Sequence, residues 1–284
     1  MKVKTLVAAL GVALTMNSFA GSVSGAVPTL RENKEIDYQV GQKTYKIKVA
    51  VIHPEDRKNT PYIILNHGRA SEHLEQADFT YFLELGRYLT NMGFTVVIPI
   101  RVGYGRERET DIESDFPVNA RTCQAKLEFG AEVMADEGRV INEFVRSLPY
   151  INPENGIMGG HSFGGAMAVA VGGHNLPGIK GIVSLSGGMG GKANSEPMCK
   201  DDTARIFENY SKLTNVPELW VYGDKDDRLK NAYQGWYDSF QKGGGTAQLV
   251  VINNGTHNIG SSERISEVSK IIKQYAIERG VISE

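Results

Sequence analysis

From about residue 61 onward, the chain alternates between short apolar runs and longer segments whose apolar residues recur at helical spacing. The run "PYIILNHG" (61–68) ends in a polar turn, which is typical of a strand buried on both faces of a sheet. The segment that follows, 78–93, places Phe82 and Leu89 on one helical face and ends at Gly93. Strands and helices that alternate in this way form a mainly parallel sheet with helices on both faces.

The same pattern predicts eight strands and a single domain. The first two strands, "EIDYQV" and "TYKIKVAVI", flank Gly41 and indicate an antiparallel hairpin. The other six are expected in "PYIILNHG", "FTVVIPI", "GIMGGHS", "KGIVSLSGG", "ELWVYGD" and "TAQLVVIN". Between them lie the expected helices 78–93, 126–148, "GAMAVAVGG", "TARIFENYSKL", "NAYQGWYDSFQK" and "SERISEVSKIIKQYAIE". We therefore predict one doubly wound α/β domain over 27–284, opened by a hairpin, with no linker and no internal repeat.

The first 26 residues have the layout of a secretory signal peptide. Lys2 and Lys4 precede the apolar run "TLVAALGVAL", and small residues follow it. Cleavage is expected after Ala26, with Ala20 as the alternative. The apolar run is too short to span a membrane, so we expect an exported protein, periplasmic or extracellular, and not a retained anchor.

Charge argues against two classes of partner. Loss of Lys2 and Lys4 with the leader moves the formal net charge from −2 to −4, which offers no electrostatic attraction to nucleic acid or an anionic membrane. We expect a small-molecule ester or a short peptide as the partner, and no metal or organic cofactor. The oligomeric state is not predicted.

Two cysteines, Cys123 and Cys199, fall in the long segments 103–125 and 187–199, neither of which shows regular periodicity. In an oxidising compartment an even number of cysteines favours a disulfide, here one that fastens two loops beside a ligand pocket. The alternatives are two free thiols or a metal site. A metal site would lack ligands, because no histidine cluster lies nearby.

The stretch "GGHSFGGAM" contains the pattern Gly-x-Ser-x-Gly at Gly160 to Gly164. This pattern is typical of a sharp turn between a strand and a helix that exposes the serine hydroxyl, here that of Ser162. The flanking glycines are needed because side chains there would collide with the neighbouring elements. The preceding "GIMG" is strand-like and the following "GAMAVAV" is helix-like, so Ser162 is the predicted nucleophile.

A serine nucleophile needs a base, and the base needs an acid. His257 follows the last predicted strand, whereas His174 falls at the far end of a helix, so His257 is the expected base. Asp226 is the expected acid because its position a few residues beyond the strand "ELWVYG" lets its carboxylate point back at His257; Asp224 is the alternative and Asp227 the third candidate.

An oxyanion site requires two converging backbone amides, which we expect from Phe163, after the nucleophile, and Arg69, in "LNHGRA". His67 in the same turn is expected to be structural. Four side chains in the loops at the pocket are candidates for contacting a substrate carboxylate or phosphate, but we expect these loop residues to be solvated and to pair with Glu107, Glu109 and Asp111 instead. The candidate contacts are Arg69, Arg101, Tyr104 and Arg106, whereas Trp220 and Trp236 are expected in the core.

With these motifs in place, the chain resembles the α/β-hydrolase superfamily and is similar to secreted members of its dienelactone hydrolase-like group. The resemblance rests on "LNHGRA", "FTVVIPIRVGYGR", "GGHSFGG", "GIVSLSGGMGGK", "LWVYGDKDD" and "THN", which extend from about Ile36 to Ile272. It implies the α/β-hydrolase fold, acyl transfer from an ester-like carbonyl, and Asp226 as the acid. Dienelactone hydrolases proper use a cysteine nucleophile, so dienelactone itself is not implied as the substrate.

The function expected from these features is carboxylic ester hydrolysis through an acyl-enzyme on Ser162, Asp226 and His257. A small secreted serine peptidase or amidase is the alternative within the same chemistry. A catalytically silent binding protein on the same fold is the alternative outside it.

Overall fold

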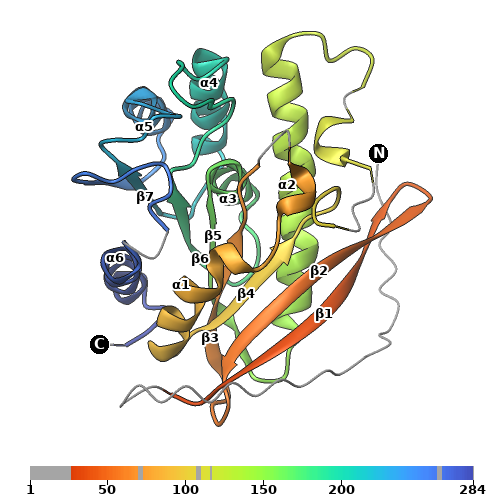
Figure 1. Cartoon of the computed structure of the whole chain (residues 1–284), viewed down its shortest axis with the longest axis vertical. Coiled ribbons are helices and arrows are strands. Elements are labelled where there is room, and N and C mark those ends of the chain that lie inside the picture. The colour runs from red at the N-terminus through yellow and green to blue at the C-terminus, as the bar shows by residue number, and fades with distance from the viewer. Residues whose placement is uncertain (1–26, 70–72, 107–109, 116, 261–263, 284) are drawn as a thin grey trace.

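A computed structural model of the chain describes residues 27–283 apart from 70–72, 107–109, 116 and 261–263 (Figure 1). The predicted signal peptide, 1–26, therefore lies outside the described residues, as do Glu107 and Glu109.

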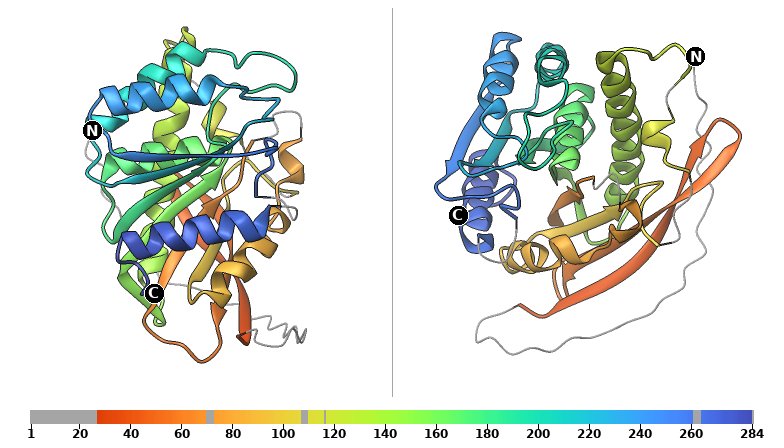
Figure 2. Two further views of the ribbon diagram at one scale, coloured as in Figure 1. Left: turned by 90° about the vertical axis from the view of Figure 1, so that its left-hand side faces the viewer. Right: turned by 45° about the horizontal axis from the view of Figure 1, so that its top comes forward.

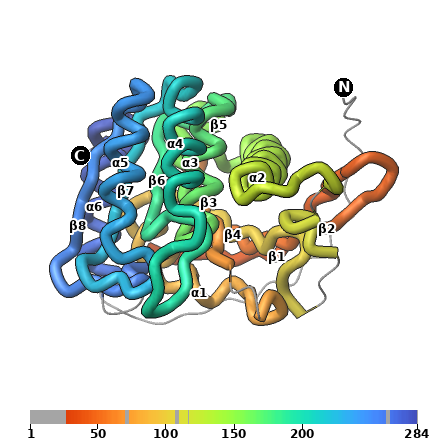
Figure 3. Tube along the Cα trace, turned by 90° about the horizontal axis from the view of Figure 1, so that it is seen from above, coloured from red at the N-terminus to blue at the C-terminus, as the bar shows by residue number. Residues whose placement is uncertain are grey.

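Eight strands form one sheet in the order β1-β2-β4-β3-β5-β6-β7-β8, with the hairpin at one edge and β8 at the other (Figure 3). The pairs β1·β2 and β2·β4 are antiparallel, and all pairs from β4·β3 to β7·β8 are parallel. This confirms the predicted α/β class and the opening hairpin. The strands are β1 (Thr29–Val40), β2 (Lys43–Pro54), β3 (Thr60–Asn66), β4 (Thr95–Ile100), β5 (Ile151–His161), β6 (Ile179–Leu185), β7 (Glu218–Gly223) and β8 (Ala247–Ile252).

Helices cover both faces of the sheet and create two cores (Figure 2). Successive strand residues point to opposite faces, so Tyr62 and Ile64 of β3 lie in one core while Ile63 and Leu65 lie in the other. The first core packs against α2 (Cys123–Arg146), α3 (Phe163–His174), α4 (Lys200–Ser211) and α5 (Ala232–Lys242). The second packs against α1 (Thr80–Asn91) and α6 (Ile265–Glu278).

Trp220 and Trp236 are almost completely buried in the first core, as the sequence predicts. Within the described residues, no helix is both long enough and apolar enough to cross a membrane.

The segments that carry the cysteines differ from the prediction. Helix α2 begins at Cys123, three residues before the predicted start, because the Thr122 hydroxyl caps it by accepting a hydrogen bond from the Ala125 amide at 3.1 Å. The segment before it includes a short 3₁₀ helix, η2 (Ile112–Ser114), and a second one, η1 (Leu74–Gln76), precedes α1.

Cys123 and Cys199 form a disulfide across 76 residues of chain. Cys199 is the residue before the first turn of α4, so the bond joins the beginnings of two helices and not two loops. The carboxylate of Asp202 lies close enough to both sulfur atoms to complete a metal-ligand group, but the disulfide takes up both sulfurs.

Candidate active site

Ser162 occupies the turn between β5 and α3 and has backbone angles of φ 55° and ψ −120°. Such angles are rare for a residue with a side chain and are kept only where the surroundings enforce them. Here the backbone packs too closely for side chains on either flank. A Cβ atom on Gly160 would lie 2.2 Å from the carbonyl oxygen of Gly164, and one on Gly164 would lie 2.2 Å from that of Asn66.

The imidazole of His257 connects Ser162 to Asp226. Its Nε2 lies 3.0 Å from the Ser162 Oγ, and its Nδ1 lies 2.8 Å from the Asp226 Oδ2. A carboxylate only accepts hydrogen bonds, so Nδ1 carries the proton and Nε2 is free to accept one from the serine hydroxyl.

Asp226 is buried and its carboxylate is fully hydrogen-bonded. Its second oxygen, Oδ1, accepts from the backbone amides of Arg228 and Leu229, each at 2.9 Å. Burial raises the pKa of Asp226, but the hydrogen bond and charge of His257 and the two amides outweigh burial, and the net effect lowers the pKa. The group is therefore an anion held in one orientation beside His257.

The other candidates for the base and the acid lie elsewhere. Asp224 and Asp227 are exposed, and the carbonyl of Asp227 accepts a hydrogen bond from the Asn194 amide. His174 pairs with Glu132 at the end of α3, with 3.2 Å between its Nε2 and the carboxylate. The structure thus brings together Ser162, Asp226 and His257, and their catalytic roles stay a prediction.

His161 contacts the segment that carries His257. Its Nε2 donates to the His257 carbonyl oxygen at 2.8 Å, and its ring stacks against Tyr81 with centroids 4.8 Å apart. Burial, with the charge of His257 as a smaller cause, lowers the pKa of His161 to about 3. The ring is neutral at physiological pH, and it helps to hold His257 in place. His161 is the unspecified second residue of the Gly-x-Ser-x-Gly pattern, so the pattern carried no signal for this contact.

The turn 67–69 lies directly beside the nucleophile position. A Cβ atom on Gly68 would lie 3.0 Å from the Cβ of Ser162, so the turn and the elbow are in close contact. Phe163 is the first residue of α3, where a backbone amide has no partner within the helix. Of the two predicted oxyanion residues, Phe163 therefore adjoins Ser162 along the backbone, and Arg69 adjoins it across the contact between the turn and the elbow.

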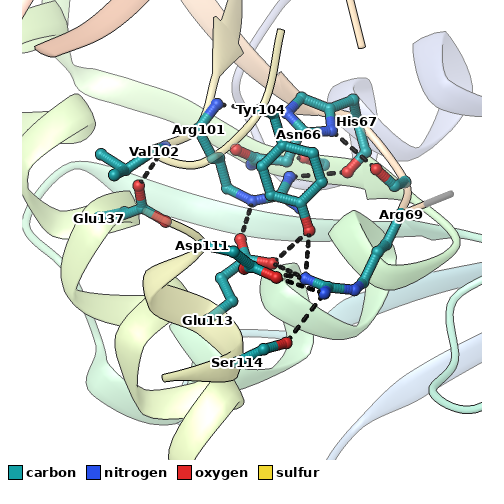
Figure 4. Close-up of polar contacts among 12 residues, drawn as sticks. Asn66, His67, Arg69, Arg101, Val102, Tyr104, Asp111, Glu113, Ser114 and Glu137 are labelled. Carbon is teal, nitrogen blue, oxygen red and sulfur yellow. Dashed lines mark hydrogen bonds and ion pairs between the residues drawn. The ribbon is translucent and has the colours of Figure 1, made fainter. Parts of the chain in front are cut away.

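The Arg69 side chain is not free to bind a substrate anion (Figure 4). Its Nη2 donates to Asp111 Oδ2 at 2.6 Å and to the Ser114 hydroxyl at 2.8 Å, and its Nη1 donates to the Tyr104 hydroxyl at 2.9 Å. Pairing of a loop cation with Asp111 is what the sequence analysis favoured over a substrate contact.

Arg101 differs from both expectations. Arg101 does not line the cavity over Ser162, and it is not a solvated loop charge, because its side chain is fully buried and its Nε donates to Glu113 Oε1 at 2.6 Å. Arg106, the fourth candidate, is exposed. Sequence reasoning missed Glu113 because a carboxylate in an irregular segment carries no local signal of burial.

A cavity of about 390 Å³ opens over Ser162 and His257. Its lining is mixed in polarity and draws on the turn 67–69, the segment 73–81, the elbow after β5 and the loops after β4, β6, β7 and β8. The lining includes His67, Gly68, Arg69, Gln76, Asp78, Tyr81, Tyr104, His161, Ser162, Arg228, His257 and Asn258. The cysteines themselves do not line it, but each of the two segments that the disulfide was expected to fasten contributes a lining residue, Tyr104 from 103–125 and Gly191 from 187–199.

No family model matches the sequence, and no curated protein matches it significantly. Solved structures do match it. A putative dienelactone hydrolase from Klebsiella pneumoniae is 16% identical, with a TM-score of 0.57, over 87% of this chain and 97% of that one. Esterase 2 from Thermogutta terrifontis, phosphorylated by paraoxon, is 11% identical, with a TM-score of 0.63, over 89% and 96%.

A putative dipeptidyl aminopeptidase IV from Bacteroides ovatus is 16% identical, with a TM-score of 0.65, over 87% of this chain. This chain spans only 36% of that protein's length. Together with the eight-stranded sheet, these matches show that the chain has the α/β-hydrolase fold, as the sequence motifs implied.

Proposed function

We propose that the protein is an exported serine hydrolase that cleaves a carboxylic ester through an acyl-enzyme, with Ser162, His257 and Asp226 as its catalytic triad. One observation carries the proposal: the continuous hydrogen-bonded chain from Asp226 through His257 to a serine held on a strained turn. The fold supports it, because α/β-hydrolases place nucleophile, acid and histidine in this order along the chain.

In the proposed mechanism, Ser162 Oγ attacks the ester carbonyl while His257 Nε2 takes the hydroxyl proton. Asp226 stabilises the imidazolium that forms. The amides of Phe163 and Arg69 donate to the oxyanion of the tetrahedral intermediate. His257 then protonates the leaving alcohol, and a water molecule activated by His257 repeats the sequence on the acyl-enzyme and releases the acid.

The cavity favours a small ester with polar groups. A volume of about 390 Å³ is near the lower end of ordinary ligand sites, and the lining combines aromatic with charged side chains. Several of the similar solved structures are esterases, which supports an ester.

Export is supported by the leader-like sequence 1–26 and by the disulfide between Cys123 and Cys199. The intact mass of the mature protein, expressed with its leader, tests this proposal. A first residue of Val27 or Gly21 is expected, and an unprocessed chain contradicts it.

The test of function compares the protein with Ser162→Ala on p-nitrophenyl acetate. The variant is expected to lose turnover while keeping its circular dichroism spectrum and melting temperature. The exposed Ser147→Ala is the matched control and should hydrolyse the ester at the original rate. A fluorophosphonate should add its mass to the peptide that contains Ser162. Labelling elsewhere, or full activity of Ser162→Ala, contradicts the proposal.

A peptidase or amidase is the second candidate, favoured by the similarity to the putative dipeptidyl aminopeptidase IV and to acylaminoacyl peptidases. Parallel assays on esters of graded chain length, amino-acid amides and short peptides separate the two. Turnover of the amides or peptides at a rate comparable with that of the matched esters would favour the peptidase, because esters are intrinsically the more reactive substrates, and no amide turnover would favour the esterase. No labelling of the folded protein by fluorophosphonate would favour a silent binding protein.

A further inference from the structure

Arg101, directly after β4, holds the turn 67–69 from two sides (Figure 4). Its side-chain Nη1 donates to the His67 carbonyl oxygen at 2.7 Å, and its backbone amide donates to His67 Nε2 at 3.2 Å. One residue thus fixes both the main chain and the ring of His67. All of these atoms are buried, so no water competes for the contacts.

Because its orientation is fixed, the His67 ring in turn fixes the peptide unit between Gly68 and Arg69. Since Nε2 accepts from Arg101, Nδ1 carries the proton and donates to the Gly68 carbonyl oxygen, 2.7 Å away. Burial and then the charge of Arg101 lower the pKa of His67 well below its usual range, in agreement with a neutral ring. In a trans peptide the carbonyl and the following N–H point in opposite directions within one plane. Fixing the Gly68 carbonyl therefore fixes the direction of the Arg69 N–H.

The Arg101 guanidinium is itself held by the segment that leads into α2. Its Nε donates to Glu113, which is fully buried and also accepts from Tyr104. Arg69 is bound to the same segment through Asp111. The turn is thus attached at both of its ends to residues 111–114.

We propose that Arg101 is a positioning residue that sets the direction of the Arg69 amide, and hence oxyanion stabilisation, by holding His67 and the Gly68 carbonyl. This inference rests on the proposed function, in which that amide contacts the oxyanion. Arg101 does not touch the substrate. Its effect belongs to the transition state, since oxyanion contacts strengthen only as charge develops.

Arg101→Lys tests the inference. Lysine keeps the positive charge beside Glu113, but a single ammonium group on a flexible stem does not reproduce the planar, two-site geometry of the guanidinium. With p-nitrophenyl acetate we expect kcat per titrated active site to fall by about 10- to 100-fold, with KM within about twofold of the original.

Glu137→Gln is the matched control. Glu137 is buried beside Arg101 and Glu113, but among the residues that the structure describes its Oε1 accepts a hydrogen bond only from the Val102 amide, at 2.8 Å, and glutamine offers the same acceptor. We expect kcat and KM of this variant to equal those of the original protein.

A trifluoromethyl ketone distinguishes positioning from a general loss of structure. Its adduct with serine places an oxyanion in the same site, so its inhibition constant should rise in Arg101→Lys by the same factor as kcat/KM falls. A merely structural role would lower the melting temperature and the titratable fraction while leaving both constants per active site unchanged.

Unchanged kcat and unchanged inhibition in folded Arg101→Lys overturn the inference, as does an equal loss in Glu137→Gln. If Arg101→Lys does not fold, Glu113→Gln replaces it. That variant removes the charge that orients Arg101, and a lower kcat per active site is again expected, with unchanged constants overturning the inference. Failure of the proposed function is separate: the original protein would then be no faster than Ser162→Ala.

Discussion

The Nε2 atom of His257 lies 3.0 Å from the Ser162 hydroxyl oxygen, although 95 residues separate the two in the chain. Their elements explain the contact. Ser162 follows β5 and His257 follows β8, and the parallel order β5-β6-β7-β8 brings the carboxyl ends of these strands to one edge of the sheet. Asp226, after β7, joins them there. The contact is therefore a product of topology.

Asp226→Asn should lower kcat/KM on p-nitrophenyl acetate by about 10⁴-fold, the size of the loss that the same change causes in the triad of a serine protease. The amide of asparagine can donate to His257 Nδ1 and so favours the wrong tautomer. Asp224→Asn is the control, because Asp224 is exposed and the hydrogen bond that its backbone amide donates to the Ile252 carbonyl oxygen, at the end of β8, does not depend on its side chain. Equal losses in the two variants would show that Asp226 is not the acid.

Gly164→Ala should lower the free energy of unfolding by about 1 to 3 kcal/mol. The new Cβ would meet the carbonyl oxygens of Asn66 and His67 at 2.2 and 2.5 Å, and backbone atoms cannot rotate away. Esterase activity per folded molecule should fall too, because the displaced carbonyls belong to the strand and turn beside Ser162.

Gly235→Ala is the control for this substitution. Gly235 lies within α5, and no atom is within 4 Å of the position that its Cβ would take. Alanine there should raise the free energy of unfolding by about 0.4 to 1 kcal/mol. Urea unfolding curves measure both variants, and a stable, active Gly164→Ala would contradict the tight packing around the elbow.

Glu137→Gln should stabilise the protein increasingly as the pH rises above the ordinary range for glutamate. Burial, and then the charge of Glu113, raise the pKa of Glu137 in the folded state well above its usual value. At a pH above the unfolded-state pKa, Glu137 must therefore take up a proton when the chain folds. Its contribution to the free energy of unfolding consequently falls as the pH rises toward the folded-state pKa. Glutamine has no such dependence.

The measurement is urea unfolding of both proteins between pH 4 and pH 8. The difference in unfolding free energy should grow by at most about 1.4 kcal/mol for each pH unit within the window. A pH-independent difference would show that Glu137 is ionised in the folded protein.

Replacing both Cys123 and Cys199 by serine should lower the free energy of unfolding by about 2 to 4 kcal/mol, because the bond closes a long loop of 76 residues. kcat should change little, since neither sulfur lines the cavity. Dithiothreitol should reduce the stability of the original protein to that of the double variant and leave the variant unchanged. A reductant-insensitive original protein would contradict a disulfide in the isolated molecule.

Local patterns in the sequence determined the order of strands and helices, the class of the fold and the elbow around Ser162. This was possible because hydrophobic periodicity and glycine-framed turns are properties of neighbouring residues. The element boundaries were less exact: α2 begins three residues before its predicted start, at a threonine cap, and β1 and β5 begin six and five residues before theirs. The same local logic placed His257 at a strand end and narrowed the acid to three aspartates.

The position of Asp226 a few residues beyond β7 already favoured it over Asp224 and Asp227. Only the tertiary structure shows that its carboxylate meets His257, because that contact depends on where the loop turns back across the sheet. It also decided which carboxylates pair with the cationic side chains. Arg69 pairs with Asp111, which was among the predicted partners, whereas Arg101 pairs with Glu113, a fully buried carboxylate whose burial no local pattern reveals. These ion pairs join the turn after β3 and the end of β4 to the segment before α2. The segments meet only because the sheet and helices pack them together, so the pairing does not follow from neighbouring residues in the sequence. The sequence therefore determined the candidate chemistry, and the packing determined which groups are free to perform it.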